Sequence, residues 1–142
     1  MTSLTADASR DESAALRTGV WLMSLGAVAF IGYAVIFFIR IFTDSFLELG
    51  IGSGQVDVGV AGFIAATGLA AALLAWFGVR RGYMWAWASA VAVPVLGLAV
   101  ALPSHYPYGF DTIGHLGLIY LATAIFVVGA LVSLKGLTEQ SE

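Results

Sequence analysis

The side chains of this sequence that could do chemistry are few, and one group of them falls between residues 105 and 115. Asp111 and His115 are four residues apart, so on a helix they would share one face. With His105 they provide imidazole and carboxylate groups, which are ligand types suited to zinc or a similar metal ion. The spacing of these residues matches no established metal motif, and paired haem ligation by the two histidines is a weaker alternative. The simpler interpretation is that His115 hydrogen-bonds Asp111 or a neighbouring helix, while His105 is solvated.

A second group of polar residues lies near the ends of the first two apolar stretches. Arg40 stands at the end of the first stretch, where its stem could lie in lipid and its guanidinium among headgroups. Alternatively, it could pair with Asp44 one turn on, or with Asp57 across the bundle. Tyr33 is seven residues before Arg40 on the same helical face, so this face could line a polar cavity. Asp57 and Asp111 each precede an apolar stretch, where a carboxylate caps a helix; the competing hypothesis makes them ligands or proton carriers.

These residues are positioned by four apolar stretches, roughly residues 18–42, 56–79, 84–102 and 112–134. A hydrocarbon core about 30 Å thick needs about 20 helical residues, and each stretch approaches or exceeds that length. The composition, 60% hydrophobic and 11% charged, is typical of a membrane protein. The sequence therefore predicts an all-α integral membrane protein, a four-transmembrane-helix bundle over residues 18–135 with polar tails at 1–17 and 136–142. Residues 42–49, after the first span, are predicted to form a short interfacial helix.

The distribution of charge predicts that both termini are cytoplasmic. Lysine and arginine favour the cytoplasmic ends of membrane spans, and all but one of the six cations lie near a terminus or in the turn between the second and third stretches. These cations are Arg10, Arg17, Arg80, Arg81 and Lys135. The four tryptophans lie within a turn or two of them, as expected for interfacial rings. The prediction is an N-in/C-in, multi-pass protein of a prokaryotic plasma membrane.

The second stretch, residues 56–79, is built largely from glycine and alanine. Small side chains let helix backbones approach closely, and lipid tails provide no competing hydrophobic force. We therefore expect this helix to be the central packing element. In the third stretch, Pro94 removes one backbone hydrogen bond and is expected to kink the helix.

Several classes of activity leave a signature that this sequence lacks. It contains no cysteine, which excludes disulfides and thiolate metal sites. A net charge of −3 and a pI near 5.2 argue against nucleic acid as a partner. No nucleophile elbow, Walker loop, His-Glu-x-x-His or dinucleotide fingerprint is present. An acidic tail before a full-length span is unlike a cleavable signal peptide, so the first span is expected to stay in the mature protein.

The leading hypothesis is a membrane component without enzymatic activity. It would be a ligand- or lipid-binding bundle, or an accessory subunit, with a polar site at the outer leaflet. Its expected partners are membrane lipids and either further copies of itself or another membrane subunit, and no cofactor is expected beyond the metal ion considered above. The alternative is a membrane-embedded enzyme, or an ion- or proton-handling protein, that uses Arg40, Asp57, Asp111 and His115.

Overall fold

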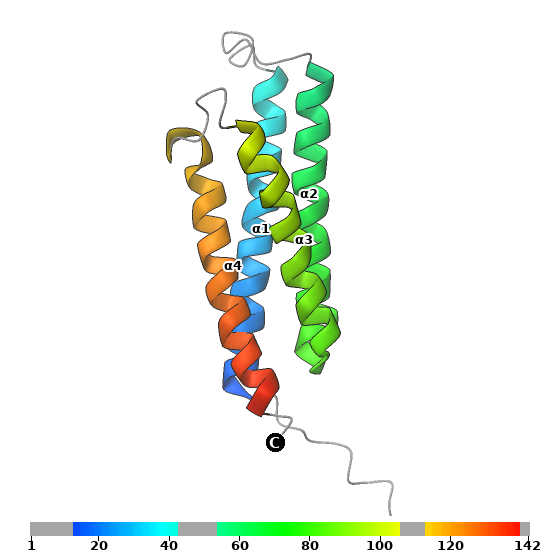
Figure 1. Ribbon diagram of the computed structural model, residues 1–142. Coiled ribbons are helices and arrows are strands. Elements are labelled where there is room, and N and C mark those ends of the chain that lie inside the picture. Colours follow the sequence, from blue (N-terminus) through cyan, green and yellow to red (C-terminus); the bar gives the residue numbers. More distant parts are fainter. Residues whose placement is uncertain (1–12, 43–53, 106–112, 140–142) are drawn as a thin grey trace, which may run out of the picture.

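The computed structural model describes residues 13–42, 54–105 and 113–139, and within these segments the chain is helical without strands. Its elements are α1 (Ala14–Phe42), α2 (Gly54–Phe77), the short 3₁₀ helix η2 (Val79–Arg81), α3 (Met84–His105) and α4 (Ile113–Glu139). The four long helices run up and down side by side, so the start of α1, η2 and the end of α4 lie at one end of the bundle (Figure 1). We call this end the η2 end, and the opposite one the far end.

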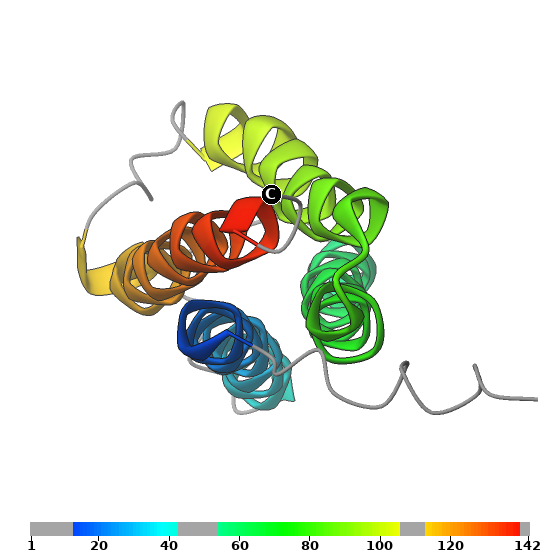
Figure 2. The same ribbon diagram turned by 90° about the horizontal axis from the view of Figure 1, so that it is seen from below.

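Helix α1 is the centre of the packing. It packs most extensively on α4 and then on α2, whereas α3 packs chiefly on α2 and makes few contacts with α4. The end view shows α1 beside both α4 and α2, with α3 across the bundle from it (Figure 2). The expectation that the glycine- and alanine-rich α2 would be the central element is therefore wrong.

Four of the glycines at the closest helix contacts belong to α1 and α4, and a fifth, Gly68, belongs to α2. A Cβ added to Gly26 of α1 would lie 2.8 Å from the backbone oxygen of Ala122 on α4. One added to Gly129 of α4 would lie 2.5 Å from the backbone nitrogen of Met23 on α1. Only a residue without a side chain permits this approach. In α2, Gly68 makes one such contact, with a Cβ 2.7 Å from the backbone oxygen of Ala27 on α1, whereas a Cβ at Gly62 would meet nothing within 4 Å.

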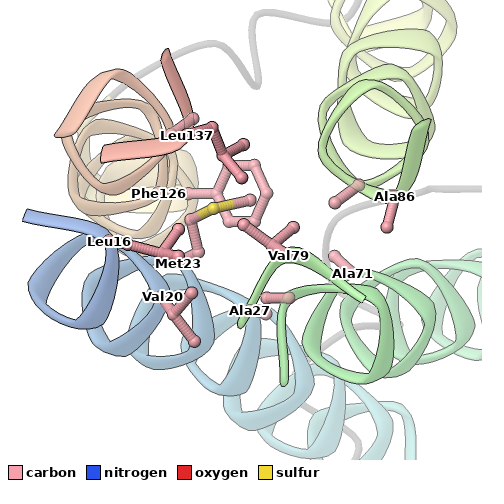
Figure 3. Packing of buried hydrophobic residues seen from close by; sticks show 12 residues of the cluster. Leu16, Val20, Met23, Ala27, Ala71, Val79, Ala86, Phe126 and Leu137 are labelled. Carbon is pink, nitrogen blue, oxygen red and sulfur yellow. The ribbon is translucent and has the colours of Figure 1, made fainter. Parts of the chain in front are cut away.

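The larger of two buried clusters lies in the half of the bundle nearer the η2 end. Helices α1 and α4 supply its large side chains, and α2 and α3 supply mainly alanines. Figure 3 shows Met23, Phe126 and Val79 gathered at its centre, with Ala71 and Ala86 at the edge nearer α2 and α3. Alanines of α2 and α3 border the cluster, and their small side chains let these two helices lie close together.

The outside of the bundle is apolar as well. Large exposed side chains include Leu25, Phe38, Phe63, Leu96 and Leu131. Three segments are long and apolar enough to cross a membrane, namely Ala14–Ile39, Gly59–Arg81 and Leu116–Glu139. The apolar segment described within α3, Met84–Ala99, is shorter. Length and surface together are those of a multi-pass membrane protein.

Several helix boundaries differ from those predicted. Helix α1 begins at Ala14 because the Ser13 hydroxyl accepts a hydrogen bond from the backbone N–H of Leu16 at 3.1 Å and caps the helix. Helix α3 is continuous through Pro94 and ends at His105. Helix α4 runs on to Glu139, beyond the predicted end at residue 134. The predicted interfacial helix at 42–49 lies, after its first residue, outside the described residues.

A tight turn joins α2 to α3 at the η2 end. Gly82 has a φ of 83°, a left-handed conformation that favours glycine. Its backbone N–H donates to the Val79 oxygen at 2.9 Å, and that of Tyr83 donates to the Gly78 oxygen at 3.2 Å. A Cβ at Gly78 would collide with the side chain of Ala86 on α3. The turn therefore holds the two helices in close contact at this end.

Candidate functional site

An apolar pocket lies between all four helices in the half of the bundle away from η2. Its volume is about 50 Å³, several times the roughly 10–15 Å³ that one water molecule needs. The lining residues are Phe30, Tyr33 and Phe37 of α1, Val60, Phe63, Ile64 and Thr67 of α2, Pro94, Gly97 and Leu98 of α3, and Leu116 and Ile119 of α4. Along α2 the lining extends over about two helical turns, or about 10 Å.

The pocket exists for two reasons. Helix α3 is held against α4 near the η2 end, and further along α3 one of the residues that line the pocket is a glycine without a side chain. The indole Nε1–H of Trp87 donates to the backbone oxygen of Ala130 on α4 at 2.9 Å. Two to three turns on, Gly97 is buried but has no side chain. A Cβ added there would lie 3.4 Å from Cε1 of Phe63 and 3.8 Å from Oγ1 of Thr67. These are contact distances without collision, so the space beside Gly97 can take added atoms.

The chemistry of the pocket is that of a hydrocarbon binding site with few polar groups. Tyr33 and Thr67 provide the hydroxyl groups of the lining. The Tyr33 ring stacks on Phe37, with centroids 6.0 Å apart and planes 18° apart, which fixes it on the α1 wall. Such a lining can bury an apolar chain or ring and offer it one or two hydrogen bonds.

Tyr33 is the sequence-predicted site residue that the structure places in this pocket. By backbone position, the others in helices belong to the far end: Arg40 near the end of α1, Asp57 in the first turn of α2, His105 at the end of α3 and His115 in the first turn of α4 (Figure 1). Their side chains lie outside the description, as does the whole of Asp111. Their convergence on one site stays a prediction.

The position of Asp57 differs from the one predicted. Helix α2 begins at Gly54, so Asp57 lies within the first turn and not before it. A carboxylate there still complements the positive end of the helix dipole, but it is not the residue that precedes the helix. Where the structure is described, no group of three or more potential metal ligands comes together. The side chains of the predicted set His105, Asp111 and His115 lie outside that part, so this metal site stays untested.

Aromatic rings and cations gather at the η2 end, as predicted. Trp21 of α1 meets Trp76 of α2 edge to face, with ring centroids 5.0 Å apart. The Arg80 guanidinium lies 4.7 Å from the Trp76 ring. At the start of α3, Tyr83 stacks on Trp85, with centroids 6.1 Å apart.

Trp87 also makes a contact inside the bundle. Its hydrogen bond to Ala130 makes it a tie between α3 and α4. Other residues of the site that sequence reasoning missed are Thr67 and Gly97. A threonine and a glycine inside apolar stretches are common at packed helix contacts, so the sequence did not mark these two as residues of a binding site.

Comparison with known proteins adds no further information about the site. The chain matches no protein family, no curated protein and no solved structure.

Proposed function

We propose that this chain is a four-span membrane protein with cytoplasmic termini, and that its pocket binds the apolar part of a lipid or small amphiphile. The observation that carries the proposal is the pocket itself, which is apolar and lined by all four helices. In a membrane bundle, an unfilled space of this kind forgoes the dispersion contacts of close packing. A ligand chain would restore those contacts, which is the physical reason to expect an occupant.

The orientation follows from charge. Arg17, Arg80, Arg81 and Lys135 belong to the η2 end, which is the end that lysine and arginine favour on the cytoplasmic side. On this orientation the pocket lies in the outer half of the membrane. A ligand chain in it would then carry its polar group toward the far end, where Arg40, Asp57 and His115 belong by sequence.

A photoreactive fatty acid tests this proposal. The probe is palmitic acid carrying a diazirine and an alkyne, added to the purified full-length chain in detergent and crosslinked by light. Peptide mass spectrometry should find the label on the walls of the pocket, within 30–37, 60–67 and 94–98. The variant Gly97→Leu, which fills the space beside Phe63, should lose that label.

The matched control is Gly62→Leu, which adds the same side chain at an exposed position with nothing within 4 Å of its Cβ. It should keep the label on the pocket walls. Label spread evenly over the lipid-facing surface and unchanged by Gly97→Leu would contradict the proposal.

A further inference from the structure

Two tryptophans and Arg80 form one arrangement across the contact of α1 and α2, and Arg17 belongs beside it by its position in α1. Trp21 and Trp76 meet with their ring planes at 78°. Arg80 follows Trp76 by four residues and lies against its ring. Arg17 precedes Trp21 by four residues, so it shares a face of α1 with that ring. Because α1 and α2 are antiparallel, both arginines belong to the η2 side of the ring pair; we call the four residues the tryptophan–arginine cluster.

The backbone of the cluster is held firmly on both helices. Ser13 caps α1 one turn before Arg17. Trp76 packs against the main core, and Val79, beside Arg80, is fully buried. The fixed turn through Gly82 ends η2 and leads into α3. Ordering of this kind lowers the entropy that a ligand must overcome on binding.

Helix stability does not explain the placement of Arg17. It lies in the first turn of α1, where the positive end of the helix dipole disfavours a cation by a few tenths of a kcal/mol. Within the described segments at this end, Glu139 pairs with Lys135 at 3.8 Å.

The chemistry of the cluster fits a phosphate that carries a glycerol backbone. Guanidinium groups bind phosphate oxygens through paired N–H donors. A guanidinium that stacks on an indole ring still directs its N–H groups outward, in a plane parallel to the ring. Trp21 is 60% exposed, so its ring offers a flat amphipathic surface beside the arginines. Indole rings favour the level of the glycerol and carbonyl groups in a bilayer.

We propose that the tryptophan–arginine cluster binds the headgroup of an anionic glycerophospholipid of the cytoplasmic leaflet. Arg17 and Arg80 bind the phosphate, and Trp21 covers the glycerol region. The inference rests on the proposed membrane insertion and orientation, but it is independent of the pocket, which lies in the other half of the bundle.

Native mass spectrometry of the purified full-length chain tests the cluster. The chain is titrated with phosphatidylglycerol or phosphatidylcholine, and the lipids retained after removal of detergent are counted. The wild type should retain phosphatidylglycerol in preference to phosphatidylcholine. The double variant Arg17→Gln/Arg80→Gln should weaken retention of phosphatidylglycerol about tenfold, because two charge-assisted phosphate contacts are lost. Both positions are exposed, so thermal stability should fall only slightly, through loss of the contact between Arg80 and the Trp76 ring.

The charge-matched control is Arg81→Gln/Lys135→Gln, which removes the same charge from the same end of the molecule. It should change retention less than about twofold, since exposed charges act weakly at a distance in salt. Equal loss in the two double variants would overturn the inference in favour of general electrostatic attraction. So would equal retention of the two lipids by the wild type, or displacement of phosphatidylglycerol by millimolar inorganic phosphate.

Membrane insertion is measured separately, so the two proposals can fail independently. A chain that alkaline carbonate extracts from membranes is not inserted, and that result overturns both proposals. A chain that resists extraction, but whose double variants behave alike, leaves the proposed function standing and removes the lipid site. If the pocket is not crosslinked but retention of phosphatidylglycerol is as expected, the lipid site at the cluster stands and ligand binding in the pocket is overturned.

Discussion

Gly129 sets how closely α4 can approach α1, and its replacement is the sharpest test of the packing. A Cβ at this position would lie 2.5 Å from the backbone nitrogen of Met23, and backbone cannot swing aside. We expect Gly129→Ala to lower the free energy of unfolding by about 1–3 kcal/mol, the usual range for overpacking. Thermal unfolding in detergent, followed by circular dichroism, measures the change.

The control for Gly129 is Gly32→Ala on the exposed side of α1, where a Cβ would meet nothing within 4 Å. It should leave the unfolding temperature unchanged or raise it slightly, through better helix propensity. Equal unfolding temperatures for the two variants would show that α1 and α4 are not in close contact.

Gly97 should respond in the opposite sense to Gly129, because it borders open space. An added methyl group would lie 3.4 Å from Phe63 and would replace a flexible residue inside a helix. We expect Gly97→Ala to raise the free energy of unfolding by about 0.5–1 kcal/mol. The same unfolding measurement checks this, and a loss of stability would mean that the pocket is already filled by protein.

Single residues of the site could be predicted from the sequence only where their spacing along one helix was enough to place them. Tyr33 was identified because it shares a face with Arg40, and it does line a cavity, though an apolar one. Gly97 could not be identified, since the space beside it depends on Phe63 of another helix. Trp87 was grouped with the interfacial rings, yet it points inward to Ala130. Two residues from Trp85, it lies about 200° round the helix from that exposed ring.

Helix α3 is the most weakly attached of the long helices, and Trp87 is its specific tie to α4. Replacing Trp87 by Phe keeps most of the ring but removes the Nε1–H donor to Ala130. We expect a loss of about 0.5–1 kcal/mol, as for other hydrogen bonds between membrane helices. Hydrogen exchange should rise along α3 more than along α1 or α4, because α3 has few other contacts with α4.

Trp85→Phe is the matched control for Trp87, because Trp85 is 63% exposed and stacks on its neighbour Tyr83. It should leave exchange along α3 unchanged. A uniform rise in exchange over all helices, in either variant, would mean that Trp87 stabilises the bundle as a whole and is not a local tie.

At the scale of elements, the lengths of the apolar stretches predicted the helices but not which helices pack on one another. Each long helix was anticipated within a few residues, since a continuous apolar stretch of this length strongly predicts a long helix. The ends were less predictable, because they depend on local bonds such as the cap from Ser13 to Leu16. Glycine content indicated that α2 could approach another helix closely. Which helices do so depends on the faces that meet, and Gly26 and Gly129 lie on such faces.

For the molecule as a whole, the two ends have different characters. The η2 end has the tight turn, the tryptophan–arginine cluster and the larger of the two buried clusters. The pocket occupies the other half. The asymmetry of charge that was visible in the sequence thus coincides with an asymmetry of packing that was not, because packing depends on contacts between distant segments.

The predicted orientation, with both termini in the cytoplasm, can be tested on the intact cell because the chain has no cysteine of its own. Single cysteines are introduced as Thr138→Cys, exposed near the end of α4, and Ser45→Cys, between α1 and α2. A membrane-impermeant maleimide should label Ser45→Cys in intact cells, and should label Thr138→Cys only after permeabilisation, since the cations of the η2 end are held on the cytoplasmic side. The cysteine-free chain reports background labelling, and permeabilised cells show that both positions can react. Labelling of Thr138→Cys from outside would show that the orientation is the opposite of the one proposed. The pocket would then lie in the inner half of the membrane and the tryptophan–arginine cluster in the outer leaflet.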